Sequence, residues 1–437
     1  MFAYYLQLGL RSLCRNPVLT GLMIIAIGFG VAASMATYAV FQAVSGNPIP
    51  GKSSQLFTPQ IDNWGPNQGR SDGSLPDALT YTDVKALMSA NVATRQAATY
   101  PVSLSLIPSD PRANAMVANG YATYADFFGM FNVPFLYGSA WPSSDDARHG
   151  NGVVISRKLN QRLFGGTDSV GKVLNLDGND YRVAGVIDHW NPRPRFFDAA
   201  NGSGFAGEPD FYMPFTRAID LQIETSGNNN CSGGPVASGW SGWLQSECVW
   251  LAYWVELPDA AAVQRYRSFL TGYAANQQRA GRFGWAPRVA LSDVQQWLDI
   301  QRVVPPETRV SLLVSLGFLV VCLVNTIGLL LAKFMRRAPE IGVRRALGAS
   351  RSEIYRQFLL EAAAVGLAGG ALGLLLTWFG VLGVGLVFER DIARLAHLSP
   401  ALVALTILVA VIATVVAALY PTWRAACVQP AWQLKSN

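Results

Sequence analysis

The residues whose types and spacing could do chemistry are few, and each candidate motif lacks a necessary part. Residues 166–173 read G-x-x-x-x-G-K-V, and Val173 stands where a phosphate-binding loop has a Ser or Thr hydroxyl for the metal ion. The residues that follow alternate like a strand, whereas phosphates need a helix N-terminus there. Residues 239–242 read Gly-Trp-Ser-Gly, in which the second glycine comes one residue too early for a nucleophile elbow. We therefore expect no nucleotide site and no serine nucleophile here.

The histidines add little to this inventory. There are three, His149, His189 and His397, and none has a partner at metal-ligand spacing. Asp188 and His189 could form an acid–base pair, or they could lie solvated in a loop. The sequence predicts no catalytic residue, no metal site and no enzymatic activity of this chain by itself.

The main structural elements that the sequence predicts are long apolar runs. Only 14% of the 437 residues are charged, against about 25% in soluble domains. Four runs reach the roughly 20 residues that span a bilayer, and each should be a helix because backbone amides in lipid bond within their own segment. The runs are residues 18–43, 310–332, 359–388 and 401–420, interrupted only by Glu361. The first run exceeds the about 7–15 residues of a signal-peptide core, which indicates an uncleaved anchor.

Basic residues beside the spans set their orientation. Residues 333–358 carry Lys333, Arg336, Arg337, Arg344, Arg345, Arg351 and Arg356. By the positive-inside rule, this segment and both termini are cytoplasmic, and residues 44–309 lie outside. Residues 1–17 would form a cytoplasmic amphipathic helix, 389–400 a short outer loop and 421–437 a cytoplasmic tail. The basic surplus faces anionic lipid, so no nucleic acid partner is expected.

The fold class is therefore a membrane α-helical protein, with one plus three spans around a large extracytoplasmic α+β domain of two subdomains. Strands are predicted at residues 153–155, 172–176 and 181–187 with a turn at 177–179, and helices at 158–164 and 257–276. Residues 191–247 are rich in Gly, Pro and Ser and are predicted to be irregular. Several tryptophans could form a core or a ligand surface, and they include Trp240, Trp243, Trp250 and Trp254.

Two of the five cysteines, Cys231 and Cys248, fall in the outer segment, 17 residues apart. In an oxidising compartment this spacing favours a disulfide, with two free thiols or two different partners as the alternatives. Closing such a loop stabilises the fold by about 3 kcal/mol in the chain-entropy model.

The cytoplasmic connection between the second and third spans has strong helix signals. Pro339 and Glu340 suit the first turn of a short helix, and Gly348 suits its end. Ser350 and Glu353 match a capping box that starts the next helix, which continues into the third span. A helix of this kind either anchors lipid headgroups or docks on a cytoplasmic partner.

The segment from Glu340 to Ala362, EIGVRRALGASRSEIYRQFLLEA, resembles the signature of the MacB/FtsX-type permeases of ABC transporters. The segments Leu8–Ser34 and Tyr420–Lys435 resemble their first span and closing stretch, and VVISRKLNQRLFGGTDSVGKVLNLDGNDYRVAGVI resembles their outer domain. This resemblance implies a permease that works as a dimer on two cytoplasmic ATPase subunits, which would bind ATP and Mg, while this chain holds no cofactor. The segment implied to contact the ATPase is Glu340, Ile341, Gly342, Val343, Arg344, Arg345, Ala346, Leu347, Gly348, Ala349 and Ser350, with Arg344 and Arg345 as ion-pair donors.

The resemblance also implies mechanotransmission in the inner membrane of a bacterium. ATP-driven closure of the ATPases on the cytoplasmic side would move the outer domain on the other side. Members like MacB carry an ATPase in the same chain, whereas here the first span follows only a short helix, so a separate ATPase is expected. The second permease could be the same chain or a sister chain. Gly366 with Gly370, and Gly369 with Gly373, form G-x-x-x-G pairs that could pack between permeases or within one bundle.

Three function classes fit this resemblance. The first is export or efflux with a periplasmic adaptor and an outer-membrane channel, which the large outer domain favours by analogy. The second is lipoprotein release from the outer leaflet. The third is FtsX-like regulation of a cell-wall hydrolase or a sensor without transport.

Overall fold

The computed structural model describes residues 16–65, 73–108, 114–202, 204–231, 238–304, 306–387 and 400–426. The chain forms two compact units, a helical unit of residues 1–45 with 304–437 and an outer unit of residues 46–303. The predicted amphipathic helix at 1–17 lies almost entirely outside the described residues, as do nearly all of the loop at 389–400 and most of the tail at 421–437. His397, Cys14 and Cys427 also lie outside them.

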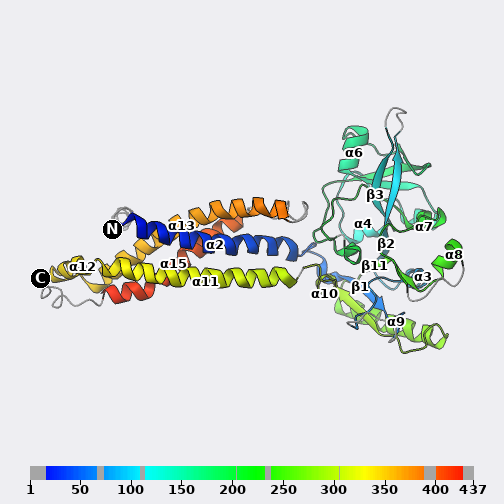
Figure 1. Cartoon of the computed structure of the whole chain (residues 1–437). Coiled ribbons are helices and arrows are strands. Elements are labelled where there is room, and N and C mark those ends of the chain that lie inside the picture. The colour runs from blue at the N-terminus through cyan, green and yellow to red at the C-terminus, as the bar shows by residue number, and fades with distance from the viewer. Residues whose placement is uncertain are drawn as a thin grey trace. The chain divides into compact units, whose positions relative to one another are not determined.

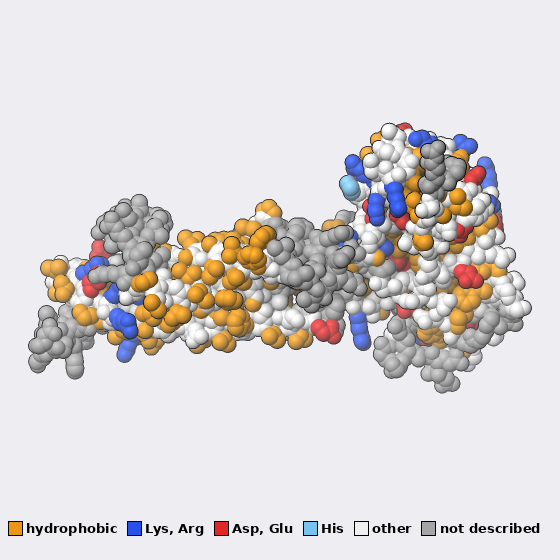
Figure 2. All heavy atoms as spheres, turned by 45° about the horizontal axis from the view of Figure 1, so that its top comes forward, with side chains coloured by type: hydrophobic (Ala, Val, Ile, Leu, Met, Phe, Trp, Pro, Cys, Tyr) orange, Lys and Arg blue, Asp and Glu red, His pale blue; other side chains and the backbone are white. Residues whose placement is uncertain are grey.

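Four long helices make up the helical unit. They are α2 (Pro17–Ser45), α11 (Pro306–Met335), α13 (Arg351–Val387) and α15 (Pro400–Ala426), and the short α12 (Ala338–Ala346) joins α11 to α13. These four are the described helices long and apolar enough to cross a membrane, and hydrophobic side chains cover the face of the bundle seen in Figure 2. The predicted arrangement of one plus three spans is confirmed.

Four buried threonines inside the spans are satisfied by their own helices. The hydroxyls of Thr326, Thr377, Thr406 and Thr414 each donate to the carbonyl four residues earlier, at 2.6–2.8 Å. Since these threonines are buried, the bonds remove the cost of placing a free hydroxyl in an apolar interior.

The glycine pairs of the third span pack within one bundle. A Cβ at Gly366 would lie 3.0 Å from Val411 on α15, and one at Gly370 would lie 3.1 Å from Ala410 on the same helix. The other pair faces α2, where a Cβ at Gly369 would lie 2.8 Å from Ile27. Gly373 lies one turn further along this contact, against Val31. Both pairs therefore hold α13 between α15 and α2.

The outer unit is built on one mixed sheet. In the described residues its strands are β1 (Leu56–Ile61), β2 (Arg95–Ile107), β3 (Met116–Thr123), β4 (Phe135–Gly138), β5 (Gly152–Ser156), β6 (Val173–Leu176), β7 (Asn179–Ile187), β8 (Phe211–Pro214), β11 (Ala252–Glu256) and β12 (Val289–Asp293). The order is β12-β1-β11-β2-β3-β8-β5-β7-β4, and β6 pairs with both β2 and β7. These pairs join β2, β3, β8, β5, β7 and β6 into a closed ring. The sheet runs through the whole unit, and the division into two subdomains stays a prediction.

Helices and short helical turns surround this sheet (Figure 1). They are η1 (Ser53–Gln55), α3 (Tyr81–Ala90), α4 (Asp126–Met130), α5 (Ser143–Arg148), α6 (Arg157–Phe164), η2 (Phe196–Asn201), α7 (Phe215–Asp220), α8 (Gly239–Leu244), α9 (Ala260–Arg279) and α10 (Val294–Ile300). The strands predicted near 153–155, 172–176 and 181–187 are β5, β6 and β7, and the predicted helices are α6 and α9. The turn between β6 and β7 is Asp177-Gly178, both with positive φ.

The prediction that residues 191–247 are irregular was wrong, because η2, α7 and α8 lie in this range and so does strand β8, the most important of these elements. Strand β8 lies in the middle of the sheet, parallel to β3 and antiparallel to β5, and all four of its residues are buried. A four-residue strand buried on both faces has no alternation of polar and apolar residues, so the pattern that reveals half-buried strands is missing.

A network of ion pairs joins three separate segments of the outer unit. Arg282 lies between Asp83 of α3, at 2.5 Å, and Glu247, at 2.7 Å. The Asp83 side chain is 1% exposed, and it also accepts hydrogen bonds from Thr80 and Tyr273. The network therefore links α3, the end of α9 and the segment before β10 (Cys248–Val249).

The stability of the outer unit is expected to depend on pH through Asp146. Burial raises the pKa of this carboxyl from 3.8 to about 6, although it accepts hydrogen bonds from the Ala125 amide and the Trp141 ring. Because the folded-state pKa lies above the unfolded one, the folded protein binds this proton more tightly than the unfolded chain does. The stabilisation that results is complete below about pH 4 and is lost as pH rises through about 6. In urea unfolding, Asp146→Asn should remove up to about 3 kcal/mol of this loss. A pH dependence identical in both proteins would contradict the assignment.

Candidate functional site

Helix α12 is fixed at both ends by the signals in its sequence. Pro339 lies in its first turn, and at its end the Gly348 and Ala349 amides donate to the Arg345 and Arg344 carbonyls. This is a Schellman ending, and Gly348 supplies the positive φ that it requires, at 99°. The helix therefore stops at a defined residue before α13 begins.

The capping box predicted for the next helix is present. The Glu353 amide donates to the Ser350 hydroxyl at 3.2 Å, and the Ser350 amide donates to the Glu353 carboxylate at 2.9 Å. Each side chain satisfies a backbone donor that the helix start leaves free. Together with the Schellman ending, the box gives the connection between α12 and α13 one conformation.

The two faces of α12 differ sharply. Ile341 and Gly342 are buried, and Ile341 belongs to the core of the helical bundle. On the other side, Val343 is 56% exposed and Leu347 is 83% exposed. Ile341 and Gly342, both named from the sequence as ATPase contacts, thus face the bundle, and the face open to a partner carries Val343 and Leu347. The resemblance placed all four in the contact segment without separating them.

The two arginines of α12 have different surroundings. Arg344 pairs with Glu340 one turn earlier at 2.6 Å and donates to Gln357 of α13 at 3.1 Å. Its side chain is 43% exposed, so the guanidinium can still meet a partner's carboxylate. Arg345 is half-buried. The surface of α12 therefore has an aliphatic patch, Val343 and Leu347, beside a basic edge, Arg344 and Arg345.

A cluster of charged side chains lies where α11 leads into α12. Glu361 of α13 accepts from Lys333 of α11 at 2.7 Å and from Arg337, which precedes α12, at 3.0 Å. Lys333 also donates to the hydroxyl of Thr20 on α2 at 3.2 Å. We refer to Thr20, Lys333, Arg337 and Glu361 as the polar node.

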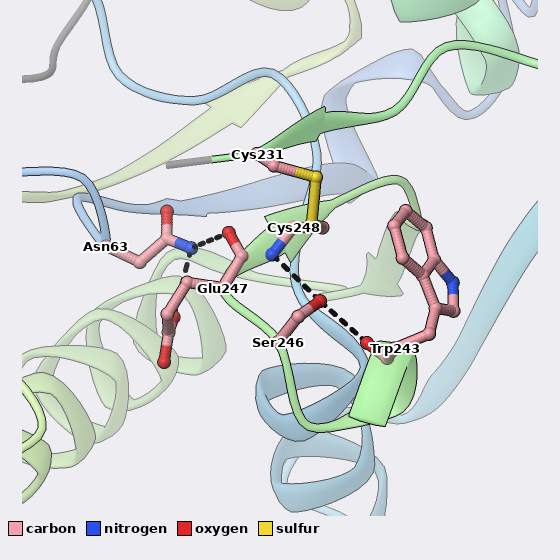
Figure 3. The surroundings of a disulfide bond; sticks show 6 residues. All are labelled: Asn63, Cys231, Trp243, Ser246, Glu247 and Cys248. Atoms are coloured by element: carbon pink, nitrogen blue, oxygen red, sulfur yellow. Dashed lines mark hydrogen bonds between the residues drawn. A yellow bond between two sulfur atoms is a disulfide. The ribbon is translucent and has the colours of Figure 1, made fainter. Parts of the chain in front are cut away.

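In the outer unit, Cys231 and Cys248 form a disulfide between β9 (Asn230–Cys231) and β10 (Figure 3). Ser246 supports the second strand, since its hydroxyl donates to the Trp243 carbonyl at 2.6 Å and accepts from the Cys248 amide at 3.3 Å. Asn63 donates to Glu247 at 3.3 Å and so ties this loop to the segment after β1. The disulfide and these contacts tie β10 to β9 and to the segment after β1.

The tryptophans of this region divide into two groups. Trp250 and Trp254 are buried in the core of the outer unit. Trp240 and Trp243 are half-buried and line a cavity of about 360 Å³, together with polar side chains that include Glu224. The alternatives of core and surface thus both apply, to different residues.

The remaining chemical candidates stay apart in the structure. Asp188 pairs with Arg157 at 2.8 Å on the surface, and His149 pairs with Asp220. In the described part of the chain, no three His, Cys, Asp or Glu side chains come together as a metal site. Val173 begins strand β6, so the G-x-x-x-x-G-K-V segment leads into a strand, as expected.

The comparisons with known proteins agree with this arrangement. Residues 20–272 match the MacB-like periplasmic core domain, and residues 312–430 match the FtsX-like permease C-terminal domain. The chain belongs to the MacB/FtsX-type permease family. The permease is 23% identical over 373 residues to the macrolide export ATP-binding/permease protein MacB of Pasteurella multocida, covering 85% of this chain and 51% of that protein.

The macrolide export ATP-binding/permease protein MacB 1/2 of Paracoccus denitrificans is 25% identical over 397 residues. This match covers 88% of the permease and 51% of that protein. The permease thus spans about half the length of these curated relatives. Among solved structures, the periplasmic region of MacB from Actinobacillus actinomycetemcomitans is 14% identical with a TM-score of 0.36, covering 59% of the permease and 96% of that structure.

Proposed function

We propose that this chain is the membrane subunit of an export ABC transporter that passes ATP-driven motion to its outer domain. In this proposal separate cytoplasmic ATPase subunits bind ATP and Mg and dock on α12. The chain lies in the inner membrane of a bacterium, with both termini in the cytoplasm, and pairs with a second permease. A periplasmic adaptor and an outer-membrane channel would complete the export path.

The observation that carries the proposal is the surface of α12. This helix buries Ile341 in the bundle while it exposes Leu347 at 83%, and its C-terminal end is fixed by the hydrogen bonds of the Schellman ending. An exposed leucine beside arginines suits a protein partner, because an apolar side chain gains free energy when it is buried and arginine is enriched in interfaces. A rigid helix joined to two spans would pass on a displacement without bending.

The experiment is affinity purification of the tagged permease in mild detergent, followed by mass spectrometry. An ABC ATPase together with an adaptor would support the export function. An ATPase with a cell-wall hydrolase or sensor would replace it with a regulatory function, and an ATPase with a lipoprotein carrier would replace it with lipoprotein release. Purification without any ATPase would refute the proposal.

Charge reversal on α12 should weaken the ATPase contact. In Arg344→Glu/Arg345→Glu the basic edge becomes acidic, and we expect at least about tenfold less ATPase to co-purify, since like charges across an interface repel by more than 1 kcal/mol. Membrane insertion should persist, as measured by carbonate-resistant membrane association. The matched control is Arg265→Glu/Arg267→Glu on the exposed face of α9. Equal ATPase recovery with both double variants would contradict the assignment.

A further inference from the structure

The polar node is almost completely closed to solvent. The side chains of Lys333 and Glu361 are 0% and 1% exposed, and that of Arg337 is 12% exposed. Each oxygen of the Glu361 carboxylate binds a different cation, Oε1 with Lys333 and Oε2 with Arg337. One carboxylate on α13 thus holds the last turn of α11 and the residue that precedes α12.

Stability does not account for such a cluster. Removing charges from water costs about as much as their attraction returns, and well-packed apolar residues often replace a buried ion pair without loss. What a buried pair does provide is geometry, because its charged hydrogen bonds are short, directional and strong where the dielectric constant is low. The node therefore fixes the relative positions of the helices it joins.

Most other contacts in this region lack this directionality. Ile341 of α12 packs into the apolar core, and the ring of Phe334 on α11 lies against that of Phe358 on α13 with centroids 4.3 Å apart. One exception is the exposed bond from Arg344 to Gln357, which joins α12 to α13 but not to α11 or α2. Apolar contacts are non-directional, so helices held by them alone can slide or rotate against each other. The bond from Arg337 to Glu361 prevents this at the residue that precedes α12, and the bond from Lys333 to Thr20 extends the connection to α2.

We propose that Glu361 is a positioning residue that locks α12 to α11 and α2, so that a displacement of α12 moves these two spans as one body. The inference rests on the proposed function, since an ATPase must supply the displacement. Arg337 connects the node to α12, and Lys333 connects it to the spans. Breaking the Arg337 contact should leave the ATPase bound but uncouple its motion from the spans.

The decisive variant is Arg337→Gln, because it leaves the pair of Lys333 with Glu361 in place and so spares the buried core. Hydrogen exchange of the permease–ATPase complex is compared by mass spectrometry with and without a non-hydrolysable ATP analogue. In the unaltered complex the nucleotide should change exchange in α12 and also in the far part of α11, residues 307–320. In Arg337→Gln the change in α12 should remain and the change in α11 should be lost. Arg337→Lys, which keeps the positive charge, should restore the change in α11.

Glu361→Gln is the second variant, with the same expected loss, and Glu307→Gln is its control. Glu307 is an exposed glutamate at the opposite end of α11, so its variant should behave like the unaltered complex. If Arg337→Gln and Glu361→Gln keep the change in residues 307–320, the inference is wrong while the proposed function stands. If the nucleotide changes nothing in α12 of the unaltered complex, the proposed function itself fails.

Discussion

Leu347→Asp is expected to abolish stable association with the ATPase. An 83% exposed leucine that becomes buried in an interface contributes about 2 kcal/mol, and a carboxylate at the same place must also lose its water. The affinity should therefore fall by at least about 30-fold. The measurement is ATPase binding to the detergent-purified permease by biolayer interferometry.

Val117→Asp is the matched control for this variant. Val117 is a 67% exposed aliphatic residue of β3 in the outer unit, so the same change occurs there without touching α12. Binding that is equally weak in both variants would point to general misfolding. Binding that is intact in Leu347→Asp would show that the ATPase docks elsewhere.

Arg282→Met is expected to destabilise the outer unit by about 3–5 kcal/mol, because it leaves the buried Asp83 carboxylate without its cation. For a unit of this size the midpoint of thermal unfolding should fall by roughly 10 °C. Tryptophan fluorescence of the full chain follows the transition, since Trp250 and Trp254 are buried in this unit.

Arg157→Met tests whether burial is the cause. Arg157 also binds a carboxylate, Asp188, at 2.8 Å, but both side chains are exposed, at 46% and 40%. An exposed pair contributes less than about 1 kcal/mol, so this variant should unfold within about 3 °C of the unaltered chain. Equal losses in the two variants would mean that the network of Arg282 has no special role.

The spans and α12 could be predicted because their signals are local. Long uncharged runs, a proline, a glycine and a capping box each act within a few residues of chain. Strand β8 could not be predicted, since its stability comes from pairing with β3 and β5 rather than from its own pattern. The sequence showed Glu361 only as an interruption in an apolar run. Its partners lie on other helices, and only packing brings them together.

The candidate site shows the same division. The extent of the α12 segment followed from the family resemblance, but the orientation of the helix did not. Ile341 and Leu347 are both apolar, and which of them faces the bundle depends on the rotation of α12 against α13 and α15. The division of the tryptophans between core and cavity is likewise set by tertiary structure.

The chain passes between its two units twice, and both passages lead to neighbouring strands. After α2 the chain enters β1, and it leaves through β12 toward α10 and α11, while β1 and β12 pair antiparallel from Phe57 opposite Asp293 to Ile61 opposite Val289. In mechanical terms these strands form a lap joint. A load along the strands shears all the hydrogen bonds of the joint together, whereas a load that pulls the strands apart sideways breaks them one after another. The joint therefore resists shear along β1 and β12 better than it resists peeling.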